Sequence, residues 1–147
     1  MAEGKVVSLQ LCVGHREPMD TRDRVVALTG TGLEGDRHAN PQSHRQVLLM
    51  EKEILDSLDL KPGTIRENVT ISGLLIHQLP AGQRLHIGDG VVLEITGLCE
   101  PCSRMDEIRA GLRETLDGKR GVLTRVLQGG VLQVGDRIAL EVPSLSR

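Results

Sequence analysis

The chain contains no phenylalanine, tyrosine or tryptophan among its 147 residues. Aliphatic side chains and methionine must therefore fill its core, and no ring is available to stack on a nucleobase. Proteins that hold single-stranded nucleic acids depend on such aromatic platforms. The 18 basic and 20 acidic residues give a net charge of −2, which also removes the basic field that phosphate-backbone binding requires. We therefore expect no nucleic-acid partner.

Long apolar runs and an even set of cysteines are missing as well. No run approaches the roughly 18 apolar residues of a membrane span, and residues 1–5 lack the basic-then-apolar order of a signal peptide. Three cysteines, an odd number, do not form a disulfide framework. The length is typical of one domain with its own core. We therefore predict a single domain over residues 1–147, with free thiols, cytoplasmic and with no membrane partner.

The patterns that are present predict short strands joined by glycine turns. Residues 5–13 alternate between Val7, Leu9, Leu11 and Val13 on one face and Val6, Ser8, Gln10 and Cys12 on the other, which is typical of a strand. Residues 25–28 predict a strand, and residues 46–50 predict a strand that runs into a helix ended by residues 61–63. Residues 121–127 fit a strand or a helix.

A near-repeat links residues 85–95 with residues 132–142, and each copy reads as strand, Gly-Asp turn and strand. Both copies predict a β-hairpin. Taken together, the patterns predict a mainly β (α+β) fold, a mixed-topology β-barrel with a few short helices. Its core would cover about residues 4–142, and we expect the tail of residues 143–147 to be loosely held.

The most informative segment is residues 96–106, which holds Cys99 and Cys102. Ser103 is a candidate N-cap of a short helix over about residues 103–109, with Asp106 as the partner for its free amides. A thiol beside a helix start is favoured as a thiolate, which is a nucleophile, a sulfur carrier or a soft metal ligand. The alternative is equally weighted: most free cysteines are small buried hydrophobic residues.

Cys99 and Cys102 form a Cys-x-x-Cys pair, which suits a redox dithiol or half of a zinc site. No βαβ pattern supports a thioredoxin-like fold. Cys12 and His15 offer a second pair with the same spacing, so a structural zinc site is a third hypothesis. It requires Gly14 to bend the chain, because Cys12 and His15 otherwise lie on opposite faces of a strand.

Several polar residues are candidates for binding an anionic ligand. The glycine-rich segment 32–38 follows no nucleotide-binding fingerprint, but its backbone can approach a ligand closely and offers Arg37 and His38 to an anion. Further donors lie at expected turns or strand ends, where the alternative is an ordinary solvated surface group. They are Arg45, Arg66, Asn68, Lys119 and Arg120. The histidines at 15, 44, 77 and 86 show no metal-ligand spacing.

With these segments in view, the chain resembles the MOSC family, named after the C-terminal domain of molybdenum-cofactor sulfurase. The resemblance rests on residues 32–39, 44–49, 62–70, 85–88, 96–102, 120–122 and 130–136. It spans about residues 4–142 and implies a β-rich, barrel-like fold.

The resemblance also implies a site. The characteristic cysteine of the family corresponds to Cys102, which would ligate molybdenum, and Cys99 is a secondary candidate ligand. Other positions match segments that line the family's cleft and would bind the cofactor. They are Gly35, Asp36, Arg37, His38, Arg45, Arg66 and Asn68, with Arg120 as a further candidate.

Two functions follow from the resemblance, and the sequence leaves open which applies and whether the chain is an enzyme. The first is binding of the molybdenum cofactor (molybdopterin) and reduction of N-hydroxylated compounds, with electrons from a separate donor protein. The second is a non-catalytic sulfur carrier with a persulfide on Cys102, destined for metal–sulfur centres. A separate cysteine desulfurase would load it, and pyridoxal phosphate would belong to that partner alone.

Overall fold

The computed structural model describes residues 3–142 and consists mainly of β-strands. Eight strands form the larger sheet: β1 (Glu3–Leu11), β2 (Asp20–Arg22), β5 (Val47–Glu51), β6 (Val69–Ser72), β7 (Arg84–Ile87), β8 (Val91–Leu98), β9 (Val122–Gln128) and β11 (Arg137–Leu140). Three form a smaller sheet: β3 (Arg24–Leu28), β4 (Gly32–Leu33) and β10 (Gly130–Gln133). The helices are α1 (Lys52–Ser57), α2 (Ser103–Ile108) and α3 (Leu112–Thr115), with a 3₁₀ turn, η1 (Ile76–Gln78).

The larger sheet closes into a barrel of seven strands. Its order is β11-β7-β8-β9-β5-β6-β1, and β11 also pairs with β1, which joins the two ends. Strand β2 extends the sheet by pairing with the end of β1. The β5–β6 pair is parallel whereas the other pairs of the barrel are antiparallel. The prediction of a mixed-topology, mainly β barrel with short helices is confirmed.

The residues of β1 do not keep the two faces that strict alternation predicts. Its pairing with β6 shifts between Val6 and Ser8, so Val7 is an extra residue in a β-bulge. A bulge reverses the sides on which later residues point. Val6 and Leu9, predicted on opposite faces, are consequently both buried in the barrel. Val13, predicted on the same face as Leu9, lies beyond the end of β1 and is 49% exposed.

Only one of the two predicted hairpins forms. Strands β7 and β8 pair directly around the turn after Ile87, but β10 pairs with β3 and β11 pairs with β7 and β1. The turn between β10 and β11 is hydrogen-bonded to β1: Gly135 N donates to Val6 O, and Val6 N donates to Asp136 O, both at 2.8 Å. This contact sends the two strands into different sheets, so the second hairpin prediction is wrong.

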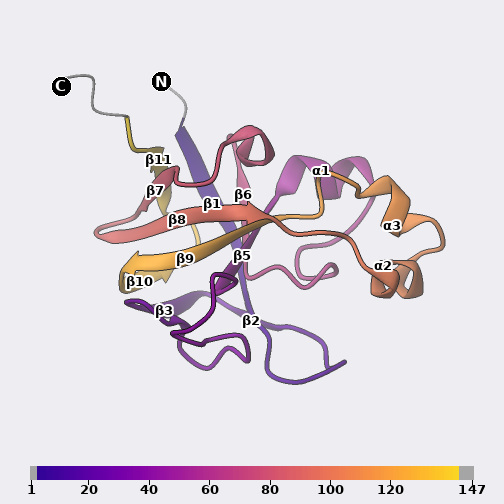
Figure 1. Cartoon of the computed structure of the whole chain (residues 1–147), viewed down its shortest axis with the longest axis horizontal. Coiled ribbons are helices and arrows are strands. Elements are labelled where there is room, and N and C mark those ends of the chain that lie inside the picture. The colour runs from indigo at the N-terminus through magenta and orange to yellow at the C-terminus, as the bar shows by residue number, and fades with distance from the viewer. Residues whose placement is uncertain (1–2, 143–147) are drawn as a thin grey trace.

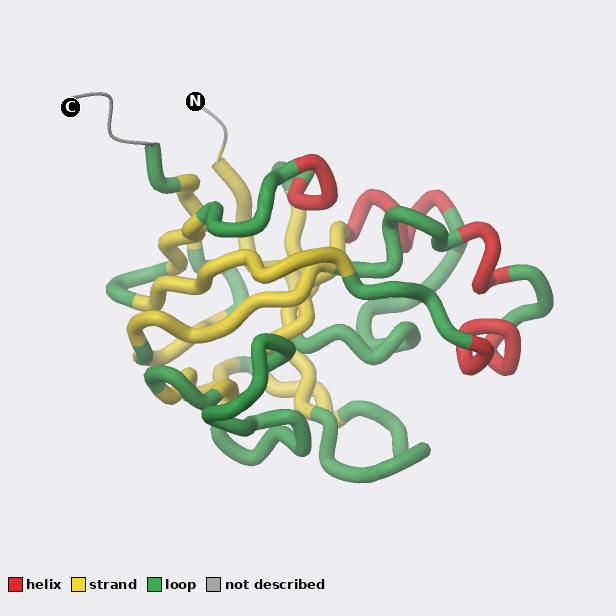
Figure 2. Tube along the Cα trace, viewed as in Figure 1, coloured by secondary structure: helices red, strands yellow, loops and turns green. Residues whose placement is uncertain are grey.

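The helices gather beyond one end of β8 and β9, while the strands fill the other side of the molecule (Figures 1 and 2). Helix α1 follows β5 as predicted, but it ends at Ser57 rather than near Lys61, because Asp59 adopts a positive φ of 55°. Apolar residues from the helices, the adjoining loops and the end of β5 form a second core cluster beside the barrel core. Its members are Met50, Leu55, Leu60, Ile65, Met105, Leu112 and Leu116.

The segment that fitted a strand or a helix is strand β9. The expectation of a loose tail at residues 143–147 falls outside the described residues. Within residues 3–142, no helix has the length and apolar character needed to cross a membrane.

A buried hydrogen-bonded contact between Glu51 and His77 fixes η1 to the end of β5. Glu51 Oε2 lies 2.6 Å from His77 Nδ1 and accepts a hydrogen bond from the His77 backbone N–H at 3.1 Å. Burial alone would raise the pKa of Glu51, but the contacts with His77 outweigh it and hold that pKa below its usual value of 4.5. His77, which showed no ligand spacing, has a structural role here.

We expect Glu51→Gln to lower the free energy of unfolding by roughly 1.5–3 kcal/mol at neutral pH, as for a lost hydrogen bond to a charged group. A lowered folded-state pKa stabilises the protein above the unfolded-state pKa, and this contribution disappears as the pH falls through the folded-state value. The difference between variant and wild type should therefore shrink below about pH 4. Urea unfolding of variant and wild type, at neutral pH and below about pH 4, measures this difference in the free energy of unfolding. The exposed substitution Glu34→Gln is the control. A difference that does not change with pH would contradict the assignment.

Candidate functional site

A cleft of about 200 Å³ lies where the barrel meets the helices, and we call it the thiol cleft. Its walls come from the ends of β5, β8 and β9, from α2, and from the segments before β5 and β6. The residues that line it are His38, Arg45, Leu48, Arg66, Asn68, Cys99, Cys102, Arg104, Met105, Arg120 and Leu123. None of these is acidic. The fold thus brings both candidate thiols together with five of the eight predicted cofactor-binding residues.

Cys102 stands at the start of α2, but its role there differs from the prediction. Cys102 itself is the N-cap residue, with extended backbone angles (φ −119°, ψ 174°), and Ser103 is the first helical residue. Asp106 makes no capping bond; its carboxylate accepts a hydrogen bond from Arg113 N at 3.0 Å. Cys102 is exposed. The helix has only six residues, so the positive charge near this thiol comes mainly from arginine side chains.

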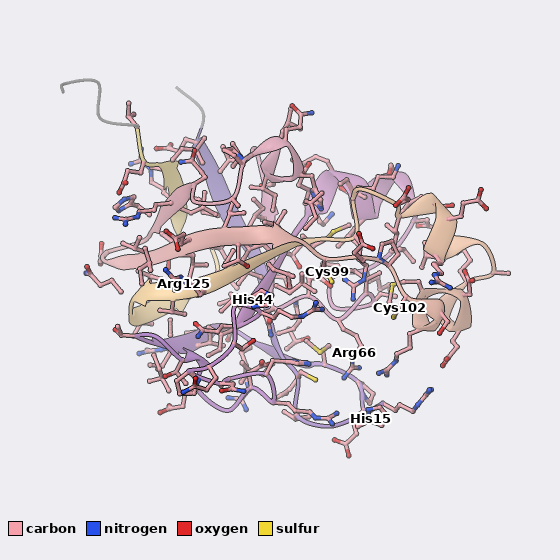
Figure 3. The ribbon with its side chains drawn as sticks, viewed as in Figure 1. His15, His44, Arg66, Cys99, Cys102 and Arg125 are labelled. Carbon is pink, nitrogen blue, oxygen red and sulfur yellow. The ribbon has the colours of Figure 1, made fainter. Side chains whose placement is uncertain are left out.

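Cys99 is the inner of the two thiols and is 7% exposed. Its backbone N–H donates to Gly121 O at 2.9 Å, which joins the end of β8 to the start of β9. Arg45 Nη2 lies 3.8 Å from its Sγ. Figure 3 shows Cys99 on the barrel side of the cleft and Cys102 on the helix side. The cleft therefore holds one buried and one accessible thiol.

Arg120 is the most unusual residue of the cleft. It is 7% exposed, and its Nε and Nη1 atoms have no hydrogen-bond partner within the described residues. Burial lowers the pKa of Arg120, while a negative charge on the nearby Cys99 or Cys102 sulfur acts in the opposite direction. Buried donors without acceptors cost free energy. A bound anion would satisfy them.

Glu67, which the sequence analysis did not single out, lies fully buried near Arg120 without pairing with it. Its Oε2 accepts hydrogen bonds from Gly63 N (3.0 Å) and Thr70 Oγ1 (2.8 Å), and its Oε1 has no partner among residues 3–142. Burial raises the pKa of Glu67. No ion pair joins Glu67 to Arg120 among residues 3–142, and the Arg120 Nε and Nη1 atoms have no carboxylate partner there.

Asn68 lines the cleft and is held there by Asp36 and by backbone groups. Asp36 Oδ1 accepts from Cys12 N at 2.6 Å and from Asn68 Nδ2 at 3.0 Å. Asn68 Oδ1 accepts from Leu48 N at 3.0 Å. Burial would raise the pKa of Asp36, but the contact with His38 and the backbone donors outweigh it and lower that pKa. This network positions the segment that carries His38.

The remaining candidates of the glycine-rich segment lie outside the cleft lining. Gly35 is exposed and has a positive φ of 84°, so it makes the turn that brings Asp36 inward. Arg37 is exposed, and its backbone N–H donates to Cys12 O at 2.7 Å. The glycine-rich pattern of residues 32–38 therefore reflects mainly the geometry of the loop, and His38 is the residue of this segment that lines the cleft.

Arg66 ties the loop after β1 to the cleft. Its Nη1 donates to Glu17 O at 2.6 Å, and its Nη2 donates to Gly14 O and to Cys12 Sγ, both at 3.0 Å. A cationic guanidinium thus occupies the position beside Cys12 where the zinc hypothesis would require a metal. Within residues 3–142, no group of three or more His, Cys, Asp or Glu is arranged to hold a metal ion. The structure does not assemble the four-ligand zinc site.

Four arginines lie near His15, and two of them, Arg66 and Arg104, line the cleft; we call this side of the cleft its cationic mouth. Partial desolvation lowers the pKa of His15, and the charges of nearby arginines lower it further. These arginines are Arg37, Arg104, Arg16 and Arg66. They come from positions far apart in the sequence, so no local motif reveals the cluster.

Comparisons with known proteins agree with this fold. A family model described as MOSC domain matches residues 34–139. Among proteins with curated descriptions, none matches the sequence. The crystal structure of YuaD from Bacillus subtilis is similar, with 20% sequence identity and a TM-score of 0.79 over 94% of this chain and 95% of that one.

Two structures of YiiM are also similar. The protein from Geobacillus stearothermophilus has 18% identity and a TM-score of 0.76, over 95% of this chain and 75% of that one. The protein from Escherichia coli has 17% identity and a TM-score of 0.70, over 98% and 71%. At these identities the neighbours establish the fold alone. Because the family model covers more than half of the sequence, the chain belongs to the MOSC domain family.

Proposed function

We propose that the thiol cleft binds the molybdenum cofactor and that Cys102 supplies a thiolate ligand to its metal. The observation that carries the proposal is the buried Arg120 guanidinium, whose Nε and Nη1 lack partners among residues 3–142. MOSC domains are associated with this cofactor in general, and its phosphate-bearing pterin is an anion that such a guanidinium would hold. Thiolate is a ligand that soft metal centres prefer.

The pairing of the other arginines supports an anionic ligand. On the barrel wall, Arg125 pairs with Glu94 at 2.9 Å and Arg22 pairs with Asp20 at 2.7 Å. By contrast, no acidic side chain lines the thiol cleft although four arginines do. A cluster of like charges is unfavourable unless something neutralises it. A bound anion is the simplest source of that neutralisation.

The size of the cleft fits one end of the cofactor. Pockets that enclose a whole small molecule usually measure about 300–1,000 Å³, whereas the thiol cleft measures about 200 Å³. A ligand would therefore insert its reactive end and leave the remainder toward the cationic mouth. Leu48, Met105 and Leu123 would keep water from part of this inner surface.

When bound, the metal would supply two-electron redox chemistry, and the candidate reaction is reduction of an N-hydroxylated compound to the amine. That reaction consumes two electrons and two protons and releases water. The residues of this chain would bind and orient: Cys102 holds the metal, and Arg120 and Arg45 hold anionic groups. Electrons would come from a separate donor protein. The required free thiols favour a reducing compartment such as the cytoplasm.

A second candidate function is sulfur transfer through a persulfide on Cys102. The observation that favours it is the exposure of this thiol, because a carrier must present its sulfur to a donor and an acceptor. Arg120 and Arg104 beside Cys102 would stabilise the negative charge of a persulfide. A separate cysteine desulfurase would load the protein.

Molybdenum and pterin analysis of protein purified from a host that makes the cofactor tests the first function. We expect about one molybdenum per chain in wild type and near-complete loss in Cys102→Ala. Arg120→Lys keeps the charge but loses the fork of donors, so we expect about tenfold weaker retention, as for one lost charged hydrogen bond.

Arg125→Lys, on β9 shortly after Arg120 but paired with Glu94, is the matched control and should retain the cofactor. Equal molybdenum content in wild type and Cys102→Ala would refute ligation by this thiol.

Mass spectrometry after incubation with a cysteine desulfurase and cysteine tests the second function. A persulfide adds one sulfur atom, and we expect this adduct on wild type and on Cys99→Ser but not on Cys102→Ser, because Cys102 is the exposed thiol. An adduct that persists in Cys102→Ser would exclude Cys102 as the carrier.

A further inference from the structure

The proposed reduction of an N-hydroxylated compound consumes two protons, but no carboxyl group lines the thiol cleft among residues 3–142. Asp36 is buried beside the cleft, and three donors reach its carboxylate. They are Cys12 N at 2.6 Å, His38 N at 3.0 Å and Asn68 Nδ2 at 3.0 Å. Although burial acts to raise the pKa of Asp36, the contact with His38 and the backbone donors lower it. Asp36 is therefore ionised at neutral pH and has no proton to give.

Glu67 is a second buried acid of this region, and its surroundings are different. It lies between Arg66 and Asn68 in the sequence, both of which line the cleft, while its own side chain is fully buried. Its Oε2 accepts from Gly63 N and Thr70 Oγ1, whereas its Oε1 has no partner among residues 3–142. A carboxylate accepts hydrogen bonds at both oxygens, so the ionised form of Glu67 is poorly satisfied here.

A buried carboxylate with closer partners behaves in the opposite way. Burial acts to raise the pKa of Glu51, yet its contacts with His77 lower that pKa. For Glu67, burial dominates and raises the pKa, against the opposing effect of its hydrogen bonds and of the Arg120 charge. An ionised carboxylate without an ion pair is costly to bury. The neutral, protonated form of Glu67 is therefore favoured.

The groups that face Glu67 come from three strands and their flanks. Gln10 on β1 and Thr70 on β6 are uncharged, and Gln10 Nε2 donates to the Glu67 backbone O at 3.0 Å and to Thr70 Oγ1 at 3.3 Å. Arg120, just before β9, is a charged neighbour whose field acts on Glu67. No hydrogen bond satisfies the facing atoms, Glu67 Oε1 and Arg120 Nε and Nη1, within the described part of the chain.

Arg120 links this buried carboxyl group to the cleft. It lines the cleft, where Cys99, Cys102 and Arg45 act on its charge. An anionic ligand group that satisfies the free donors of Arg120 is held near the Glu67 carboxyl group. The same anion offsets the positive charge that would favour the ionised form of Glu67. Binding of the ligand therefore keeps the proton on Glu67 until the reaction takes it.

We propose that Glu67 is the internal proton donor of the thiol cleft. Its carboxyl group holds a proton in the cofactor-free protein, and its Oε1 gives that proton to the ligand, directly or through one water. The reaction served rests on the proposed function: as the N–O bond of the substrate breaks, the proton joins the departing oxygen, which leaves as water. The two electrons come from the separate donor protein, and solvent supplies the second proton and later reprotonates Glu67. Arg120 stabilises the carboxylate in the meantime.

Infrared spectroscopy of the cofactor-free protein at pH 7 tests whether Glu67 carries a proton. A protonated carboxyl group absorbs at a higher C=O frequency than a carboxylate, and its band shifts in heavy water. We expect such a band in wild type, and we expect Glu67→Gln to remove it. Glu51→Gln, which replaces another buried acid, is the matched control and should leave the band in place. A wild-type spectrum without the band, or a band that persists in Glu67→Gln, would overturn the proposal.

The pH dependence of turnover by cofactor-loaded protein tests the donor role, with N-phenylhydroxylamine as substrate and reduced methyl viologen as electron source. We expect Glu67→Gln to lower kcat about 100-fold at pH 7 with KM nearly unchanged, because a positioned acid contributes about 10²–10⁴-fold. The wild-type kcat should fall at high pH as Glu67 loses its proton, and Glu67→Gln should lack this fall. A kcat of Glu67→Gln equal to that of Glu51→Gln would contradict the role.

The two measurements separate failure of the proton donor from failure of the proposed function. Loaded wild type that does not reduce the substrate refutes the reaction, even when the infrared band is present. Reduction at the wild-type rate by Glu67→Gln leaves the cofactor function intact and refutes the proton donor alone.

Discussion

The buried side-chain amide of Asn68 is the interaction on which the cleft end of the barrel depends. Its Nδ2 donates to Gln10 O on β1 and to the Asp36 carboxylate, and its Oδ1 accepts from Leu48 N on β5. Three segments that are distant in the sequence are thus joined through one residue. Hydrogen bonds of this kind are costly to leave unmade once their groups are buried. They fix the loop that carries His38 and the strand end beside Arg66.

The consequence is a site whose charges are placed before any ligand arrives. Arg120 is held in the interior at the start of β9, and Arg66 is held by backbone carbonyls of the loop after β1. Neither depends on a carboxylate for its position. Preorganised charges of this kind bind an anion without losing further conformational freedom. The proposed binding of an anionic cofactor in the thiol cleft draws on this property.

Local patterns in the sequence predicted most of the strands, but not which strands would pair. Alternation and the Gly-Asp turn predicted β7 and β8 correctly, because a hairpin is decided by neighbouring residues. The same pattern around residues 132–142 failed, since hydrogen bonds from the turn to Val6 on β1 decide the path of β10 and β11. The bulge at Val7 likewise depends on β6. Such long-range pairing leaves no local signal.

For the functional site, too, local motifs could be read from the sequence, whereas contacts between distant segments could not. Cys99 and Cys102 stand out in the sequence because they form a motif. Arg45, Arg66 and Asn68 stood out as donors at expected turns or strand ends, and the resemblance to the MOSC family assigned them to a cleft. Three features were not predictable because each arises where separate segments meet. They are the burial of Arg120, the cationic mouth around His15, and the Glu67 oxygen that has no partner among the described residues. Asp36 was expected to bind a ligand, yet its carboxylate is engaged by Cys12 N and Asn68.

The most direct measurement is a crystal structure of the cofactor-loaded protein with anomalous scattering recorded at the molybdenum edge. The account predicts a single strong anomalous peak next to Cys102 Sγ, with an anionic group of the ligand hydrogen-bonded to Arg120 Nε and Nη1. A peak away from Cys102, or an Arg120 whose two donors contact only water, would contradict it.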